Sequence, residues 1–287
     1  MSGRIAILTP DPSSDGYRTR WRDVLDRNAA PLRDCGLVVE GRAWTDAADL
    51  GAFDLVLPLL VWGYPFAPLQ WAEAVQRWAS QGVRVQNSAS VLRWNADKAY
   101  LGVLAGRGAP VVPTLYADRL TEAAMTAAAE TFGSARLVAK PRISSTAWQT
   151  IRWFPGATLD GGPEGPAMIQ PYLPAIETSG EISMLYFAGR YSHAISKRPQ
   201  PGDFRVQPEF DGIIAAHEPA EDEFEAAERI LAAAGEDLLY ARIDLVRGSG
   251  GAPELIELEL IEPDLYLGYD AGAGRRFAAA VRERIER

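Results

Sequence analysis

Strands and helices alternate through the first third of the chain, and this alternation limits the fold more than any other feature. Short apolar runs with strand character are separated by segments whose apolar residues recur at helical spacing. The expected strands are residues 5–9, 37–39, 55–60 and 83–85, and the expected helices are residues 21–35 and 71–78. This order predicts a parallel sheet covered by helices, with ligands beyond the carboxyl ends of its strands. Thr9, Asp11 and the turn at residues 62–64 are candidates to face a substrate or simply to shape those loops.

After residue 88 the pattern changes from alternation to strands in pairs. Helical spacing is expected at residues 88–108, 121–132, 221–234 and 274–286, and strands at residues 137–140, 150–153, 168–170, 181–187, 190–196, 239–246 and 254–261. Strands that follow one another without helices favour antiparallel hairpins. We therefore expect an α/β and α+β protein with an N-terminal lobe at residues 1–88, a central lobe at residues 89–171 and a C-terminal lobe at residues 172–287.

Charge and residue usage exclude several classes of function. The net charge of -9, without a basic patch, argues against nucleic acid as a partner. The chain has only two histidines, His193 and His217, and one cysteine, Cys35, so a zinc site or an intrachain disulfide is not expected. The longest apolar stretch, residues 55–62, is too short to span a membrane, and the N-terminus lacks the features of a secretory signal. We expect a cytoplasmic protein that works with carboxylates, Lys, Arg and backbone groups.

An acidic strand near the C-terminus is the most informative segment. Side chains alternate along a strand, so Glu257 and Glu259 lie on one face. The turn at residues 248–251 predicts a hairpin that brings Asp244 beside them. Three neighbouring carboxylates repel one another unless a cation lies between them, and oxygen ligands alone suit Mg²⁺. The alternative is a solvated strand face.

Two lysines precede this strand at positions suited to anions. Lys140 ends an apolar strand, and Ser144 and Ser145 follow it with hydroxyl and backbone N–H groups. Lys98 follows the acidic Asp97 in a helical region. Both lysines could hold an anion such as phosphate, or they could be ordinary surface residues.

Two further segments carry binding groups. Residues 170–174 form a proline-bracketed apolar turn, followed by Glu177 and Glu181, which could meet an adenine edge and a ribose or form an ordinary turn. Lys197 and Arg205 lie in a basic segment, where arginine could hold phosphate by paired hydrogen bonds. The alternative for that segment is salt bridges to Asp203 and Glu209.

Six segments occur in the order found in the ATP-grasp ligases. They are residues 87–98, 110–114, 138–141, 169–171, 202–207 and 257–263. On these segments the chain resembles glutathione synthetase and, more closely, the ATP-grasp enzymes that cyclise O-ureidoserine in cycloserine biosynthesis. The resemblance covers residues 87–268, with a looser match before them. It implies an ATP-grasp fold, in which a Rossmann-like N-terminal lobe precedes two α+β lobes that clasp ATP.

The resemblance also implies a role for each matched position. The nucleotide would be held by Lys98, Lys140, Ser144, Ser145, Gln170, Pro171, Tyr172, Leu173, Glu177 and Glu181. The catalytic residues would be Arg205 and Lys197, and the metal ligands would be Asp244, Glu257 and Glu259. The implied cofactors are ATP and Mg²⁺, with Mn²⁺ as an alternative metal.

The implied reaction is formation of a carbon–nitrogen bond through an acyl phosphate, with release of ADP and phosphate. Three versions stay open: cyclisation of a ureido-amino acid, ligation of two amino acids or peptides, and ATP binding without catalysis. The expected partner is a small amino-acid-like substrate, and a homodimer is expected only by analogy with the family. Departures from the family pattern are a loop without glycine at residues 142–150 and the acidic Asp264 after Pro263. The stretch of residues 155–166 is the expected mobile loop.

Overall fold

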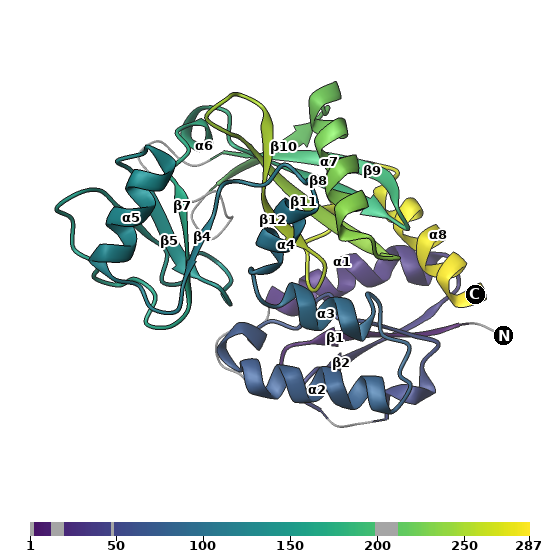
Figure 1. The fold of residues 1–287 in the computed structure, drawn as a ribbon. Coiled ribbons are helices and arrows are strands. Elements are labelled where there is room, and N and C mark those ends of the chain that lie inside the picture. Colours follow the sequence, from purple (N-terminus) through teal and green to yellow (C-terminus); the bar gives the residue numbers. More distant parts are fainter. Residues whose placement is uncertain (1–2, 13–19, 47–48, 199–211) are drawn as a thin grey trace.

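The computed structural model of the chain describes residues 3–12, 20–46, 49–198 and 212–287. Within these ranges the strands form three sheets, each with its own layer of helices (Figure 1). The N-terminal sheet lies on one side of the molecule, and the other two sheets follow it in chain order. Among the residues described, none of the helices combines the length and the hydrophobicity that a membrane crossing requires.

The N-terminal lobe is the parallel sheet expected from the alternating pattern. Its elements are β1 (Arg4–Thr9), α1 (Arg20–Asp34), β2 (Val38–Ala43), β3 (Leu55–Leu57) and α2 (Pro68–Ser80). The sheet order is β2-β1-β3, and all pairs are parallel. Ile5 and Ile7 of β1 pack on the side of α1, whereas Ala6 and Leu8 pack on the side of α2. Both faces of the sheet are therefore buried, as in other parallel sheets.

Two expectations for this lobe are wrong in detail. The strand expected at residues 55–60 ends at Leu57, because Pro58 cannot continue the hydrogen-bonded ladder. The strand expected at residues 83–85 is a single parallel bridge between Val85 and Val56. The alternation itself is confirmed.

The central lobe is a four-stranded antiparallel sheet of order β4-β7-β5-β6. Its elements are β4 (Leu115–Ala117), α5 (Glu122–Phe132), β5 (Leu137–Pro141), β6 (Ile151–Trp153) and β7 (Ala167–Pro171). The Thr121 side chain caps the N-terminus of α5, and Gly133 ends the helix with a left-handed φ of 59°. Met125 and Ala128 pack α5 onto the sheet. Strand β4 was not expected.

The C-terminal lobe is a five-stranded antiparallel sheet of order β10-β9-β8-β11-β12. Its strands are β8 (Glu181–Phe187), β9 (Arg190–Arg198), β10 (Ile213–His217), β11 (Tyr240–Arg247) and β12 (Pro253–Glu259). The helices around it are α3 (Ala89–Asn95), α4 (Tyr100–Gly106), α6 (Ala175–Thr178), α7 (Glu221–Ala234) and α8 (Ala273–Glu286). Strand β10 and helix α6 were not expected, whereas the hairpin of β11 and β12 is confirmed.

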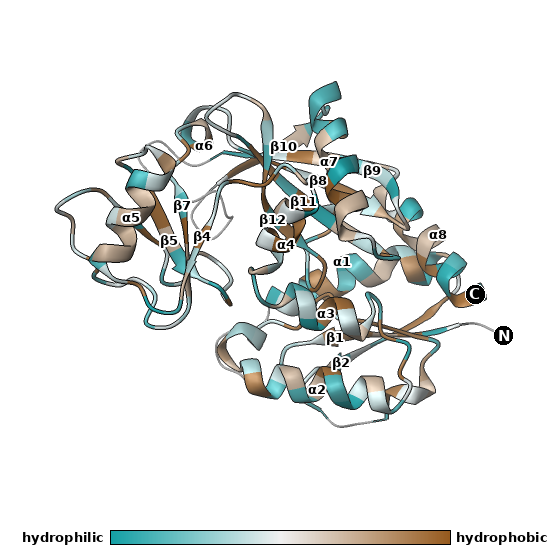
Figure 2. Cartoon of the chain, in the orientation of Figure 1, coloured by the Kyte–Doolittle hydropathy of each residue, from teal (hydrophilic) through white to brown (hydrophobic). Residues whose placement is uncertain are grey.

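One face of this sheet is covered and the other is free for chemistry. Met184, Ile243 and Leu258 pack beneath α4 and α7. Helix α7 is hydrophobic where it lies over the sheet and hydrophilic at its acidic first turn (Figure 2). A bulge between Asp244 and Leu245 shifts the register of β12. Because of this bulge, Leu255 and Leu258 both face the core although three positions separate them.

Asn87 joins the N-terminal lobe to the C-terminal lobe. Its side chain is fully buried, and its amide donates hydrogen bonds to the carbonyl oxygens of Tyr240 (2.9 Å) and Leu260 (2.8 Å). Its amide oxygen accepts a hydrogen bond from the N–H of Leu239 at 2.8 Å. One side chain thus satisfies three buried backbone groups from two segments of the C-terminal lobe.

We expect Asn87→Ala to lower the free energy of unfolding by about 3 kcal/mol or more, because each buried group left without a partner costs about 1–3 kcal/mol. Urea unfolding followed by circular dichroism measures the change. Gln70→Ala, at an exposed position of α2, is the control and should stay within about 0.5 kcal/mol of the wild type. A loss below about 1 kcal/mol for Asn87→Ala would contradict this assignment.

Candidate active site

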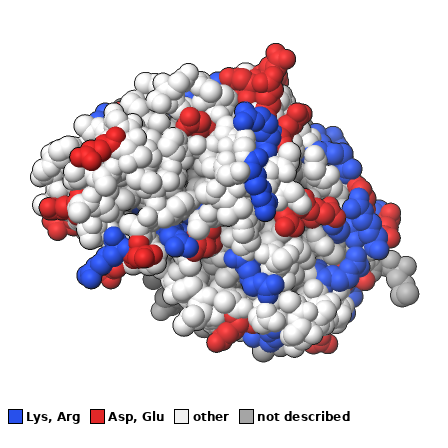
Figure 3. All heavy atoms as spheres, viewed as in Figure 1, with Lys and Arg blue, Asp and Glu red and all other residues white. Residues whose placement is uncertain are grey.

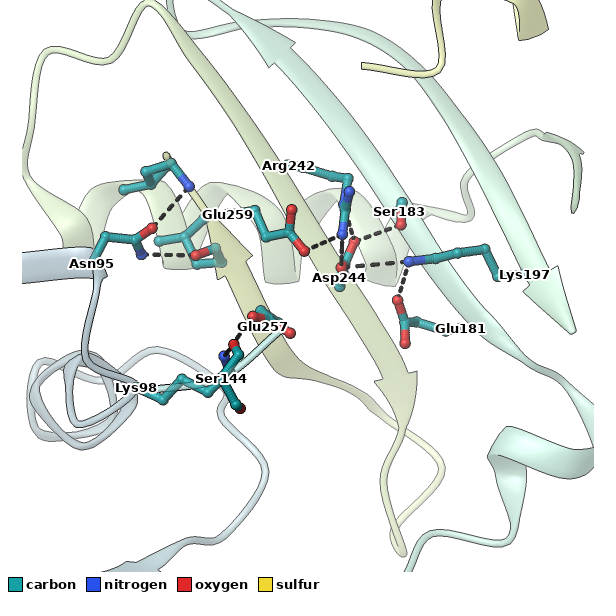
Figure 4. A network of polar contacts seen from close by, with 12 residues as sticks. Asn95, Lys98, Ser144, Glu181, Ser183, Lys197, Arg242, Asp244, Glu257 and Glu259 are labelled. Atoms are coloured by element: carbon teal, nitrogen blue, oxygen red, sulfur yellow. Dashed lines mark hydrogen bonds and ion pairs between the residues drawn. The ribbon is translucent and has the colours of Figure 1, made fainter. Parts of the chain in front are cut away.

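A band of charged side chains crosses the face of the five-stranded sheet that lies opposite α4 and α7. Seven polar residues from four neighbouring strands form it: Glu181, Ser183, Lys197, Arg242, Asp244, Glu257 and Glu259. Figure 4 shows these side chains pointing toward one another above the strands. We call this set the acidic face. It exists because alternate residues of β8, β9, β11 and β12 point away from the core.

Asp244 is the most enclosed acid of the acidic face. It is 2% exposed, and it accepts hydrogen bonds from Ser183 Oγ at 2.5 Å and from Arg242 Nη2 at 2.9 Å. Lys197 Nζ lies 3.5 Å from its second oxygen. Burial opposes ionisation, but the two cations and the hydroxyl outweigh it and lower the pKa of Asp244. Asp244 is therefore a carboxylate whose oxygens are already well occupied.

Lys197 links Asp244 to Glu181. Its ammonium group forms ion pairs with both carboxylates, and all three side chains are buried. Burial alone would lower the pKa of Lys197, but the carboxylates of Asp244 and Glu181 raise it instead. Burial raises the pKa of Glu181 against the effect of Lys197. Lys197 thus carries its charge inside the protein because two acids face it.

Arg242 joins the two strands that carry the acids predicted as metal ligands. It lies opposite Glu259 in the register of β11 and β12, and its guanidinium contacts both Glu259 and Asp244. Burial, with Glu257 and Asp244 nearby, raises the pKa of Glu259 to about 8 against the effect of Arg242. A carboxyl group with such a pKa holds its proton at neutral pH until a further cation replaces it.

Glu257 faces the central lobe. It lies opposite Asp244 in the strand register, and Lys98 Nζ is 3.1 Å from its carboxylate. Burial opposes ionisation here too, but Lys98 and Lys140 outweigh it and lower the pKa of Glu257. The hairpin therefore brings Asp244 and Glu257 together as the sequence predicts, and it adds cations that the sequence analysis did not foresee.

The protein contains 29 Lys and Arg side chains, of which three are lysines. Lys98 and Lys197 form ion pairs with acids of the acidic face (Figure 4), and Lys140, on β5 of the central lobe, lies near enough for Glu257 to influence its pKa. The other cationic positions are arginines. Lysine differs from arginine in geometry, hydration and proton affinity, so the cations gathered here differ in kind from the arginines elsewhere in the chain.

The loop at residues 142–150 is tied to the helix region that carries Lys98. Lys98 Nζ donates a hydrogen bond to the carbonyl oxygen of Ser144 at 2.7 Å. Asp97 accepts two hydrogen bonds from the guanidinium of Arg142, at 2.9 and 2.5 Å. Ser144 is buried and its hydroxyl donates to the carbonyl of Pro141, whereas Ser145 is half-buried. Ser144 thus lies beside Lys98, while the anion cradle of Ser144 and Ser145 after Lys140 stays a prediction.

Residues 146–149 of this loop adopt conformations that glycine usually takes. Thr146, Ala147 and Gln149 have φ values of 50°, 55° and 50°. Trp148 lies between them and contacts Phe66 of the N-terminal lobe, with ring centroids 5.3 Å apart in an edge-to-face arrangement. Both rings are otherwise open to solvent, at 43% and 53% exposure. The loop thus bridges two lobes through an exposed aromatic pair.

The segment predicted to meet adenine packs against the two strands that carry Asp244, Glu257 and Glu259. Gln170 is buried and donates to Thr114 Oγ1 at 2.9 Å, and Leu173 is buried against Val246 of β11 and Ile256 of β12. Pro171 ends β7 and is half-buried. Tyr172 donates a hydrogen bond to Glu177 and packs against the guanidinium of Arg136. Glu177 pairs with Tyr172, and Glu181 pairs with Lys197, so both carboxylates already have partners. Their roles toward a nucleotide stay predictions.

Arg205, the second predicted catalytic residue, lies outside the described residues. Within the described ranges, no group of three or more His, Cys, Asp or Glu side chains has the arrangement of a metal site. The chemistry of Asp244, Glu257 and Glu259 nevertheless fits a hard cation, because all three supply oxygen from neighbouring positions of one hairpin. Their role as metal ligands stays a prediction.

Three residues of the site escaped the sequence analysis. Arg242 could have been found, since it stands two positions before Asp244 on one strand and must share its face. Ser183 stands two positions after Glu181 and obeys the same rule. Arg142 carried no such signal, because its contact with Asp97 depends on how two lobes meet.

The three lysines can be distinguished by how fast each one is acetylated. We expect limiting acetylation with an N-hydroxysuccinimide ester to modify Lys140 first, because burial lowers its pKa and leaves more of the neutral, nucleophilic amine. Lys98 and Lys197 are 7% and 4% exposed and form ion pairs, so they should react later. Peptide mass spectrometry over a time course measures the order.

The N-terminal α-amino group also reacts with the ester, but it lies on a different peptide from the three lysines, so its acetylation is measured separately. Lys140→Arg is the matched control, which should remove the earliest acetylated peptide and leave the rates at Lys98 and Lys197 unchanged. Acetylation of Lys197 before Lys140 would contradict the described burial and ion pairing.

The sequence is similar to that of a known family of proteins. Residues 5–87 match the family model described as "D-cycloserine synthetase DcsG, N-terminal domain". The chain is 30% identical over 290 residues to the cycloserine biosynthesis protein DcsG of Streptomyces lavendulae, which covers 91% of this chain and 95% of that protein.

Solved structures extend the similarity to the whole fold. The crystal structure of D-cycloserine synthetase DcsG superposes with a TM-score of 0.82 at 27% identity, covering 99% of this chain and 100% of that one. A D-alanine–D-alanine ligase from Bacillus anthracis, solved with ATP, has a TM-score of 0.70 at 16% identity, covering 100% and 99%, and shares the fold. The chain therefore belongs to the family of the cycloserine biosynthesis protein DcsG and is a ligase of the ATP-grasp fold.

Proposed function

We propose that this protein uses ATP and Mg²⁺ to join a carboxylate to a nitrogen nucleophile through an acyl phosphate, with release of ADP and phosphate. The observation that carries the proposal is the convergence of all three lysines on the acidic face. Such a mixture of acids and ammonium groups suits phosphoryl transfer, which depends on positioning and on neutralising charge. Membership of the DcsG family supports the same reaction class.

The lysines nearest the central lobe are proposed to hold the phosphates of ATP. Lys98 and the half-buried Lys140 lie at the edge where the loop of Ser144 and Ser145 meets Glu257. A phosphate oxygen arriving there would replace Glu257 as the partner of Lys98. Backbone groups of residues 170–173 are the proposed contact for adenine, because the side chains of Gln170, Tyr172 and Leu173 already have other partners.

Glu257 and Glu259 are the residues proposed to hold Mg²⁺, with Asp244 beside them. When bound, the ion would neutralise phosphate charge and orient the γ-phosphoryl group for transfer. Asp244 has the least capacity left for a metal, because Ser183, Arg242 and Lys197 occupy its oxygens. Its proposed task is to keep Arg242 and Lys197 in place beneath the reacting groups.

The two chemical steps need little from the protein beyond charge and exclusion of water. A carboxylate oxygen of the substrate attacks the γ-phosphorus, the bond to the bridging oxygen breaks, and ADP leaves. The nitrogen then attacks the acyl carbon, phosphate leaves, and the nitrogen loses a proton. Water would hydrolyse the acyl phosphate, and the loop that Trp148 holds against Phe66 is proposed to exclude it.

The substrate class proposed first is a ureido-amino acid that cyclises. The support is similarity to D-cycloserine synthetase over 99% of the chain. In a cyclisation, the carboxylate and the attacking nitrogen belong to one molecule, so one organic substrate suffices. Ligation between two amino acids releases ADP only when both amino acids are present. A protein that binds ATP without catalysis releases no ADP with any substrate.

We expect O-ureidoserine alone, with ATP and Mg²⁺, to give ADP and phosphate in equal amounts together with a cyclic product. Enzyme-coupled detection of ADP and mass spectrometry of the product measure the reaction. Glu257→Ala should lower kcat at least about a hundredfold, because it removes a proposed metal ligand. Glu254→Ala, at the opposite end of the same strand, is the matched control and should keep wild-type activity.

The outcomes separate the versions of the function. ADP release that requires two amino acids would replace cyclisation by ligation between molecules. ADP release with neither compound, or none with any amino acid, would contradict the proposed carboxylate activation.

A further inference from the structure

One acid next to the acidic face lacks the cation that every other acid there possesses. Glu257 pairs with Lys98, Glu259 with Arg242, and Glu181 with Lys197. Among the described side chains, four buried polar atoms have no hydrogen-bond partner: Trp71 Nε1, Trp78 Nε1, Tyr186 Oη and Glu262 Oε2. Glu262 is the only carboxylate of the four. Each of the other acids thus has an ion-pair partner, whereas Glu262 has none among the described residues.

Glu262 is held in a rigid position just beyond the end of β12. The N–H of Leu260 donates to Asn95 Oδ1 at 3.0 Å, and the carbonyl of Leu260 accepts from Asn87 at 2.8 Å. The carbonyl of Ile261 accepts from the hydroxyl of Tyr240 at 3.0 Å. Pro263 follows and restricts the backbone further. The backbone that carries Glu262 is thus fixed before any ligand arrives.

The groups around Glu262 come from three parts of the chain. Burial and the charge of Glu259 raise the pKa of Glu262, and Lys98 and Arg242 oppose them only in part. Tyr64 of the N-terminal lobe lies near Glu262. Burial raises the pKa of Tyr64 most, and the charge of Glu262 is the next largest cause. Glu262 thus lies where the N-terminal lobe approaches the acidic face, next to the groups proposed to bind metal and phosphate.

The energetic cost of this arrangement favours a ligand with positive charge. A buried carboxyl oxygen without a partner is destabilising, and an apolar residue or a glutamine would avoid much of this cost. Phosphate is an unsuitable partner because it is itself an anion and would raise the cost of ionising Glu262 further. An ammonium group can satisfy the free oxygen and neutralise the excess acid, and an amino-acid-like substrate carries one.

We propose that Glu262 binds the α-ammonium group of the amino-acid-like substrate and thereby selects α-amino acids over substrates that lack this group. The inference rests on the proposed function, whose substrate class it makes more specific. In this arrangement the ammonium group lies between Glu262 and Tyr64, and the substrate carboxylate extends toward the proposed phosphate end. Glu262 is therefore a determinant of specificity, separate from the acids that pair with Lys98 and Arg242.

The test compares two substrates with three proteins. O-ureidoserine and its analogue without the α-amino group, 3-(ureidooxy)propanoic acid, are assayed for ADP release with the wild type, Glu262→Gln and Glu254→Gln. We expect the wild type and Glu254→Gln to prefer O-ureidoserine by about 10- to 100-fold in kcat/KM, and Glu262→Gln to lose this preference. The KM for ATP should stay within about twofold of the wild type in both variants.

A second measurement keeps the inference testable if turnover fails. Calorimetric titration of the same two compounds, with a non-hydrolysable ATP analogue and Mg²⁺ present, needs no chemistry. Binding of O-ureidoserine that weakens about tenfold or more in Glu262→Gln supports the inference even if no ADP is released, an outcome that would contradict the proposed reaction. Thermal denaturation should show Glu262→Gln to be at least as stable as the wild type, since it removes an unpaired buried acid.

Two results would overturn the inference. The first is an unchanged preference for O-ureidoserine in Glu262→Gln, by rates or by calorimetry. The second is a rise in the KM for ATP equal to the loss in kcat/KM, which would place Glu262 with the nucleotide and the metal.

Discussion

The contact of Arg242 with both Asp244 and Glu259 is the interaction on which the acidic face depends. Antiparallel pairing of β11 and β12 brings three carboxylates within reach of one another, and without cations they would repel. Arg242 lies in the same sheet face and joins the two strands, while Lys197 supports Asp244 from the other side (Figure 4). Removing one member of such a buried group leaves an uncompensated charge, which costs about 3–5 kcal/mol. The acids are thus tolerated because the sheet itself carries their partners.

Lysines and arginines lie at different places in the structure, and this difference bears on the chemistry proposed for the acidic face. Arginine serves the outer ion pairs, such as Arg284 with Asp237 and Arg190 with Glu283, and on the face drawn in Figure 3 acidic and basic side chains are interspersed. Lysine is confined to the acidic face and its edge. A compact ammonium group can exchange a carboxylate for a phosphate oxygen with little rearrangement, whereas a planar guanidinium forms a more rigid, two-pronged contact. The fold therefore uses arginine to fix acids and lysine where partners are proposed to change.

The fold was predictable to the extent that local patterns determine it. Periodicity located β8, α7 and both strands of the hairpin, and alternation placed Glu257 and Glu259 on one face with Asp244 beside them. The bulge after Asp244 was not predictable, because it depends on how Leu255 packs in the core. The contact of Trp148 with Phe66 also escaped the sequence, since it depends on where distant lobes meet.

The central claim is that the acidic face binds a nucleotide together with Mg²⁺. Calorimetric titration with a non-hydrolysable ATP analogue, with and without Mg²⁺, tests it directly on the wild type and on a Glu257→Ala/Glu259→Ala double variant. The account predicts that binding requires Mg²⁺ and weakens at least about tenfold in the double variant, whereas Glu254→Ala binds like the wild type. Failure of the well-folded wild type to bind, or equal binding by the double variant, would contradict it.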